Sequence, residues 1–155
     1  MAAGYNGKII LKNEEAISDG HRVLIDFEVD NLAAKETFDL KQDHITRCEV
    51  LPTSWKFRMM FRRVSANGIV NIPVSLKRFD SMPYQVNASI SVLLSDGRNQ
   101  SFFGGPRNFI KPKMGSGDEL LGYVNGILQF PQHIALFNEM LIVHVVIEFR
   151  YCHSA

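Results

Sequence analysis

Apolar and polar residues alternate with a period of two along several separate segments of this chain. In the first of these segments apolar residues occupy positions 23, 25, 27 and 29, and most of their neighbours are charged. Successive side chains of a strand point to opposite faces, so this period predicts strands with one buried face. Five long segments show the pattern, and they span residues 21–30, 55–62, 70–77, 86–94 and 141–150.

Turn-forming residues separate these segments. Asn67-Gly68 precedes the third, Asp96-Gly97 follows the fourth, and Gly104-Gly105-Pro106 lies further on. Several short strands with turns between them are typical of an all-β sandwich or barrel. Shorter strand candidates are residues 36–40, 45–51 and 101–110. Residues 119–130 are the one segment expected to coil into a short helical turn, and Gly122 and Gly126 limit its length.

The chain of 155 residues is long enough for one domain, and 46% hydrophobic residues can fill a core. Residues 1–20 are polar and glycine-containing, which predicts a flexible N-terminal extension or an added edge strand. We expect the sandwich to span residues 21–151, with 152–155 as a tail. The inward phase of the strands predicts nine core residues: Trp55, Phe57, Ile72, Val74, Ile90, Val92, Val143, Val145 and Ile147.

Charge narrows the choice of partners. Seventeen Lys and Arg balance sixteen Asp and Glu, for a net charge of +1. A dedicated nucleic-acid binder normally has an excess of basic residues, and a membrane anchor normally has a polybasic segment. We therefore expect neither nucleic-acid binding nor membrane anchoring. The start of the chain is unlike a signal peptide, and no apolar run reaches the roughly 20 residues of a spanning helix. We therefore expect an intracellular protein, in the cytoplasm or the nucleus.

Motifs for catalysis or metal binding do not emerge from the sequence. Cys48 and Cys152 lie far apart and in no metal-binding spacing, and the five histidines form no HExxH or Cys/His pattern. The acidic residues after Gly115-Ser116-Gly117 argue against a phosphate-binding loop. The basic pairs at 62–63 and 77–78 are interpreted as solvated strand ends. We expect no enzyme, no cofactor and no metal site.

The order of the segments is more informative than any one of them. Residues 23–31 (VLIDFEVDN) lead into Leu32-Ala33, residues 55–59 read WKFRM, and ASISVLLSDG ends at Gly97. Together with residues 70–76, 121–127 and 138–143, this ordered set resembles the MATH domain (meprin and TRAF homology). That family is an eight-stranded antiparallel β-sandwich. One departure is Leu121, which stands where the family usually has the Trp of its W-G-F motif.

The resemblance implies peptide recognition without catalysis, through main-chain pairing and pockets for alternate side chains. It also implies an adaptor or substrate receptor for ubiquitin ligation. Tyr123 would supply an aromatic wall, Gly122 would let a partner backbone approach, and Leu120 or Leu121 would give apolar contact. An apolar or basic peptide is expected. The implied site comprises Glu119, Leu120, Leu121, Gly122, Tyr123 and Val124, faced by Asn71, Pro73 and Ala88.

Other interpretations stay open from the residues alone. Residues 119–127 could be only a turn that caps the core. Pro73 interrupts a ladder, so its strand is expected to lie at an edge or to pair on one side only. An edge of this kind is either accessible to a peptide strand or protected by the proline against aggregation. A carbohydrate-binding β-sandwich is one alternative function. A sandwich used only for assembly or homo-oligomerisation is the other.

Overall fold

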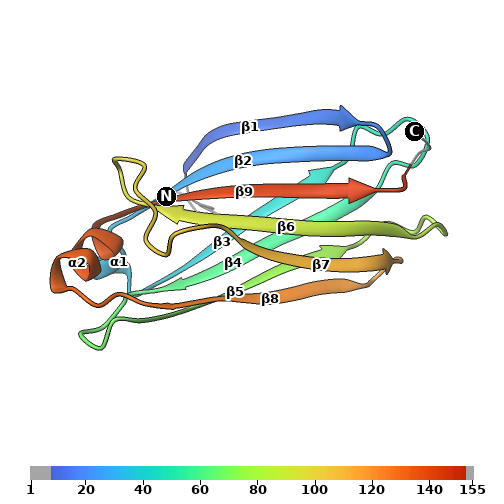
Figure 1. The fold of residues 1–155 in the computed structure, drawn as a ribbon. Coiled ribbons are helices and arrows are strands. Elements are labelled where there is room, and N and C mark those ends of the chain that lie inside the picture. Colours follow the sequence, from blue (N-terminus) through green and yellow to red (C-terminus); the bar gives the residue numbers. More distant parts are fainter. Residues whose placement is uncertain (1–7, 153–155) are drawn as a thin grey trace, which may run out of the picture.

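The computed structural model describes residues 8–152, and antiparallel strands dominate them. One sheet contains, in spatial order, β1 (Lys8–Ile17), β2 (Gly20–Asp30), β9 (Met140–Arg150), β6 (Val86–Ser95) and β7 (Arg107–Met114). The other contains β3 (Thr37–Ile45), β4 (Ser54–Arg62), β5 (Ile69–Arg78) and β8 (Glu119–Ile127). The two sheets face each other (Figure 1), which confirms the prediction of an all-β sandwich.

Side chains from the two inner faces fill the space between the sheets. All nine predicted core residues are buried, which confirms the inward phase read from the sequence. Phe27 of β2 and Phe57 of β4 stack with ring centroids 6.3 Å apart, so they join one sheet to the other. Trp55 is fully buried, and its ring centroid lies 4.6 Å from that of Phe149 on β9. Strand periodicity therefore located the core correctly.

The helical segment was placed wrongly from the sequence. Residues 119–127 form β8, and the helices are α1 (Leu32–Lys35) and α2 (Pro131–Glu139). Pro131 stands in the first turn of α2, where its fixed φ suits a helix start and its missing N–H costs nothing. None of the helices within residues 8–152 is long and apolar enough to cross a membrane.

The structure also tests the shorter strand candidates and the N-terminal extension. Residues 36–40 fall largely within β3, and β7 begins at the end of the 101–110 candidate, but 46–51 form no strand. Of the two alternatives for residues 1–20, the structure has the added edge strand over Lys8–Ile17, paired with β2. The remainder of that extension, residues 1–7, and residues 153–155 of the tail lie outside the described residues.

Arg78 departs most from expectation, because it is fully buried instead of solvated. Its guanidinium donates to both carboxylate oxygens of Asp80 and to the backbone carbonyls of Tyr84, at 2.6 Å, and Met114, at 2.7 Å. Arg78 ends β5 in one sheet and Met114 ends β7 in the other. The side chain therefore ties the two sheets together at this end of the sandwich.

Candidate functional site

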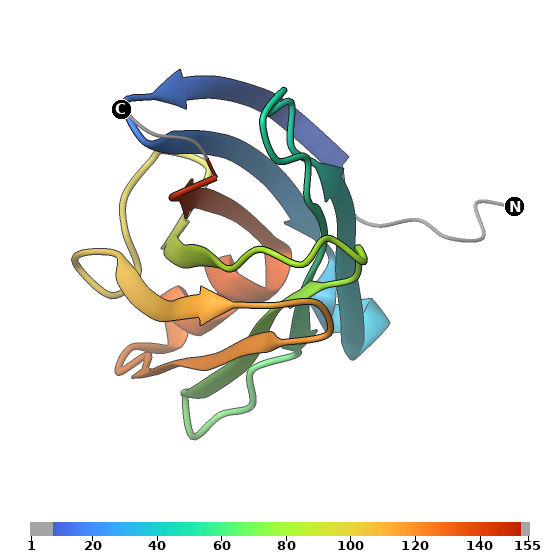
Figure 2. The same ribbon diagram turned by 90° about the vertical axis from the view of Figure 1, so that its right-hand side faces the viewer.

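β8 forms one edge of the four-stranded sheet, with β5 as its ladder partner and β7 beside it across the sandwich (Figure 2). Apolar side chains gather on the outer face of this strand pair, and most of them are about half exposed or more. The ladder places Ile69 opposite Ile127 and Pro73 opposite Tyr123. We call this surface the apolar stripe; it consists of Ile69, Pro73, Leu121, Tyr123 and Ile127.

The strand period divides the predicted site residues between two faces. Glu119, Leu121 and Tyr123 are exposed on the outer face of β8, and Asn71 is exposed on β5, with Pro73 half-buried beside it. Leu120 and Val124 point inward and are buried, so the expected apolar contact falls to Leu121 and not to Leu120.

Ala88 and Gly122 are also removed from the predicted site. Ala88 lies on β6 in the other sheet and is buried in the core. Gly122 is buried under the ring of Phe109 on β7, and a Cβ at this glycine would lie 2.3 Å from that ring. The space that the missing side chain provides is thus filled by the protein itself. The prediction that a partner backbone approaches at Gly122 is wrong.

Pro73 marks the point where two central strands separate. β5 is not an edge strand, because it lies between β4 and β8. Its ladder with β4, however, ends at the pair of Met59 and Val74, whereas its ladder with β8 continues to Ile69. The strand as a whole pairs on both sides, so the expectation drawn from the proline is wrong for β5; only its residues 69–73 pair on one side, with β8.

The missing N–H of Pro73 explains why the ladder stops there. The backbone N–H of Leu128 donates a hydrogen bond to Gly68 O, and the N–H of Arg78 donates one to Asp118 O. These bonds flank the ladder of β5 and β8, so the even-numbered residues of the two strands are the ones whose backbone groups face each other. Both backbone groups of a residue in an antiparallel strand point to the same side, so position 73 faces β4. A proline there has no N–H to donate to β4. The sheet therefore opens at this residue.

A groove of about 480 Å³ lies where β4 and β5 separate. We call it the β4–β5 groove. Pro73 and Ile69 border it, so it is continuous with the apolar stripe. Met60 and the basic residues Arg62 and Arg63 come from the facing side of β4 and the loop after it.

The same alternation directs the odd-numbered backbone groups of β8 away from β5. Two of these carbonyls are occupied, because Lys111 donates to Glu119 O at 3.1 Å and Arg107 to Asn125 O at 3.2 Å. Leu121 and Tyr123 lie between these two contacts, with their backbone groups directed to the outer edge of the sheet. β7 flanks this stretch, because Arg107 and Lys111 on either side of it come from that strand.

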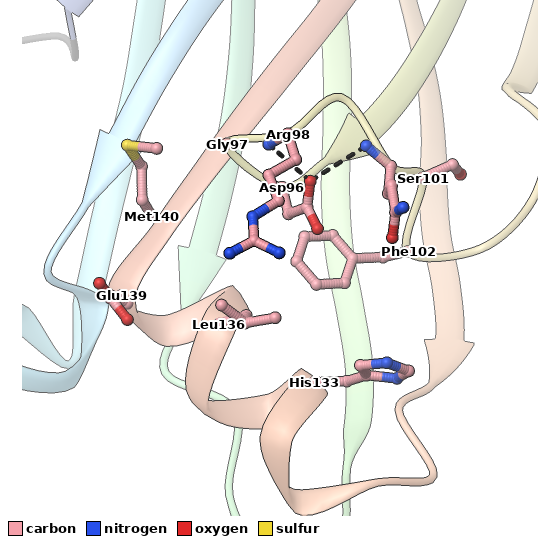
Figure 3. A pocket seen from close by; sticks show the side chains of 10 residues that line it. Asp96, Gly97, Arg98, Ser101, Phe102, His133, Leu136, Glu139 and Met140 are labelled. Carbon is pink, nitrogen blue, oxygen red and sulfur yellow. Dashed lines mark hydrogen bonds between the residues drawn. The ribbon is translucent and has the colours of Figure 1, made fainter.

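A second hollow, of about 410 Å³, lies between the turn after β6 and α2 (Figure 3). The Asp96 carboxylate accepts hydrogen bonds from the backbone N–H groups of Arg98 and Gln100, so it holds the turn instead of facing a ligand. Phe102 packs edge-on against Phe137, with ring centroids 5.2 Å apart. The aromatic ring in this hollow is therefore part of the internal packing.

The structure brings together cysteine and histidine side chains that are far apart in the sequence. His21, Cys48 and Cys152 are buried, and one potential ligand atom from each lies within 4.8 Å of the others. The sequence spacing hid this cluster because its members come from three distant segments. Within residues 8–152, these three side chains therefore form a Cys/His cluster that no spacing motif indicates.

Comparisons with known proteins add little. No family model matches the chain, and no curated protein matches it. Among solved structures, one similar chain is that of TmCBM61 in complex with beta-1,4-galactotriose, at 11% sequence identity and a TM-score of 0.27. The alignment covers 81% of this chain and 79% of that one. A similarity at this level carries no functional argument, and the interpretation rests on the surface itself.

Proposed function

We propose that this chain is a non-catalytic interaction module that binds an extended peptide of a partner protein along β8. The observation that carries the proposal is the apolar stripe beside an edge strand. An added strand would pair with the backbone of Leu121 and Tyr123, and its alternate side chains would lie over the stripe. Exposed apolar patches bordered by polar residues commonly mark interaction sites.

The chemistry of the surface defines the peptide. Apolar side chains at every second position would contact Leu121, Tyr123 and Ile127, because successive residues of a strand alternate in direction. Glu119 is exposed at one end of β8 and favours a Lys or Arg in the peptide there. The proposed ligand is therefore an alternating apolar peptide with a basic end.

The wider role is proposed on the resemblance to MATH domains. The ordered motifs from residue 23 to residue 143 support it, and so does the position of the 121–127 motif on an edge strand. The proposal is an adaptor or substrate receptor for ubiquitin ligation in the cytoplasm or nucleus. The carbohydrate-binding alternative uses exposed aromatic platforms; the single tryptophan, Trp55, is buried, and the exposed Tyr123 lies among aliphatic side chains.

Replacing Tyr123 with alanine is expected to weaken peptide binding by about 2 kcal/mol, or roughly 30-fold. The aromatic ring is 49% exposed at the centre of the stripe, so it can contact a ligand without contributing to the core. Affinity capture with the domain, followed by a peptide array of the retained proteins, supplies the peptide. Calorimetric titration of that peptide then measures the loss.

The matched control is Tyr84→Ala, since Tyr84 is a tyrosine that is 61% exposed away from the stripe. This variant should bind like the parent protein, and both variants should keep a cooperative thermal transition. Unfolding of Tyr123→Ala would make the residue structural. A folded Tyr123→Ala protein with unchanged affinity would place the interface elsewhere.

Binding to duplex DNA or RNA is expected to be weak and to disappear at physiological salt. The net charge of +1 supplies few cations to replace the counterions around phosphates, and nonspecific binding depends on that exchange. Fluorescence anisotropy with an unselected duplex, at low and physiological ionic strength, measures this. Tight binding that persists at physiological salt would contradict the proposed class.

A further inference from the structure

Three distant segments each bring one metal-binding side chain to the same end of the sandwich. His21 lies near the start of β2, Cys48 in the loop between β3 and β4, and Cys152 just after β9. Figure 1 shows the start of β2, the β3–β4 loop and the end of β9 at the same end of the sandwich. Their ligand atoms all lie within 4.8 Å of one another, and each residue is buried.

Two thiols and an imidazole form a donor set that suits zinc. Thiolate and imidazole ligands bind Zn²⁺ at about 2.3 and 2.0–2.1 Å, respectively, in a tetrahedral arrangement. Those bond lengths place the ligand atoms roughly 3.5–3.8 Å from one another. The present separations of up to 4.8 Å therefore need to shorten by about 1 Å, which small side-chain movements can provide.

Metal-binding histidines usually have a carboxylate beside the ring nitrogen that does not bind the metal, and His21 has one at Nδ1. His21 Nδ1 lies 3.2 Å from a carboxylate oxygen of Glu14, which is itself almost fully buried. Such a carboxylate fixes the ring orientation and makes the other nitrogen a better ligand. Glu14 is in turn held by His44 Nε2 at 2.5 Å and by the backbone N–H of Arg47 at 2.8 Å.

We propose that His21, Cys48 and Cys152 bind one zinc ion, with Glu14 orienting His21. His21 binds through Nε2, and a water molecule completes the four ligands. Each thiol gives up its proton to solvent, so two protons are released for each zinc bound. The ion ties β2, the β3–β4 loop and the end of β9 together.

Burial of Cys48 and Cys152 favours metal binding by the two thiols over a disulfide that forms and breaks by exchange. Both thiols are buried. Disulfide exchange requires a thiolate that another sulfur can reach, and burial limits that access. A bound zinc ion removes the thiol protons directly by coordination. The proposal therefore predicts reduced cysteines and a metal in the folded protein.

Titration of the full chain with Co²⁺ under reducing conditions tests the proposal, followed by competition with Zn²⁺. One cobalt ion should bind and give a thiolate-to-cobalt charge-transfer band, and zinc should remove it. Zinc should also raise the melting temperature in a concentration-dependent way. Cys152→Ser and Cys48→Ser should each weaken binding by at least about 100-fold, and Glu14→Gln by about 10–100-fold.

His144→Asn is the matched control, because His144 also contacts a carboxylate, Asp26, at 2.9 Å, but belongs to another part of the same sheet. It should bind cobalt like the parent protein. The proposal is wrong if the parent protein binds no cobalt, or if its spectrum lacks the thiolate band. It is also wrong if the mass under non-reducing conditions shows a disulfide. These measurements need no variant, so a serine variant that fails to fold leaves the test intact.

Discussion

Replacing Arg78 with methionine is expected to lower the free energy of unfolding by about 3–5 kcal/mol, the cost of breaking a buried ion pair from one side. The guanidinium is fully buried, and it contacts the Asp80 carboxylate and the carbonyls of Tyr84 and Met114. Methionine fills much of the volume but donates no hydrogen bond. Urea denaturation followed by tryptophan fluorescence measures the loss.

Arg58→Met is the matched control for this experiment. Arg58 donates two hydrogen bonds of 2.8 Å to Asp39, but both side chains of this pair are substantially exposed. An exposed pair contributes about 0–1 kcal/mol, because water screens it and solvates each partner when the other is removed. Equal losses in the two variants would show that burial of Arg78 does not matter to stability.

The partner carboxylate adds a pH dependence to the Arg78 cluster. Burial raises the pKa of Asp80, but hydrogen bonds from Arg78 and from the backbone N–H groups of Ser54 and Met82 outweigh it and hold the pKa below its ordinary value. A lowered carboxyl pKa stabilises the fold above the unfolded value of about 4, and this contribution disappears as the pH falls through the folded pKa. The parent protein should therefore lose stability below about pH 4 more steeply than Asp80→Asn.

Trp55→Ala is expected to cost about 3–5 kcal/mol, the range for emptying a large aromatic site. Trp55 is fully buried, packs against Phe149 and donates its indole N–H to Thr53 Oγ1 at 2.7 Å. Its removal leaves a cavity between the sheets. Circular dichroism must follow the denaturation, because Trp55 is the single tryptophan of the chain.

Trp55→Phe separates the two contributions of this side chain. Phenylalanine keeps much of the apolar volume but loses the hydrogen bond to Thr53, so a smaller loss of about 1–2 kcal/mol is expected. If Trp55→Ala were no more destabilising than Trp55→Phe, the indole would not be filling the core, and the packing between the sheets would need revision.

The candidate site was only partly predictable from the sequence. Tyr123 and Leu121 could be singled out because the 121–127 motif resembles one that binds peptides, and both lie on the exposed face of β8. Gly122 was misjudged because nothing local indicates that Phe109 lies over it. Ala88 was misjudged because motif order does not reveal which sheet a strand joins.

The error about Arg78 and the unrecognised Cys/His cluster have the same cause. Arg78 looks like a solvated strand end, and its acceptors at Tyr84 and Met114 are backbone carbonyls that no side-chain pattern announces. Cys48 and Cys152 are separated by 104 positions, so no spacing motif connects them. Only the convergence of three segments at one end of the sandwich makes them neighbours.

The amino-acid sequence by itself determined the strands, the inward phase of each and the residues of the core, because these follow from a period of two that each segment carries locally. The tertiary structure alone decided which strands became neighbours, where the sheet opens at Pro73, and which distant side chains meet around Arg78 and His21. Those outcomes depend on contacts between residues far apart in the chain. A strand's own sequence specifies which face is buried, but not what will cover it.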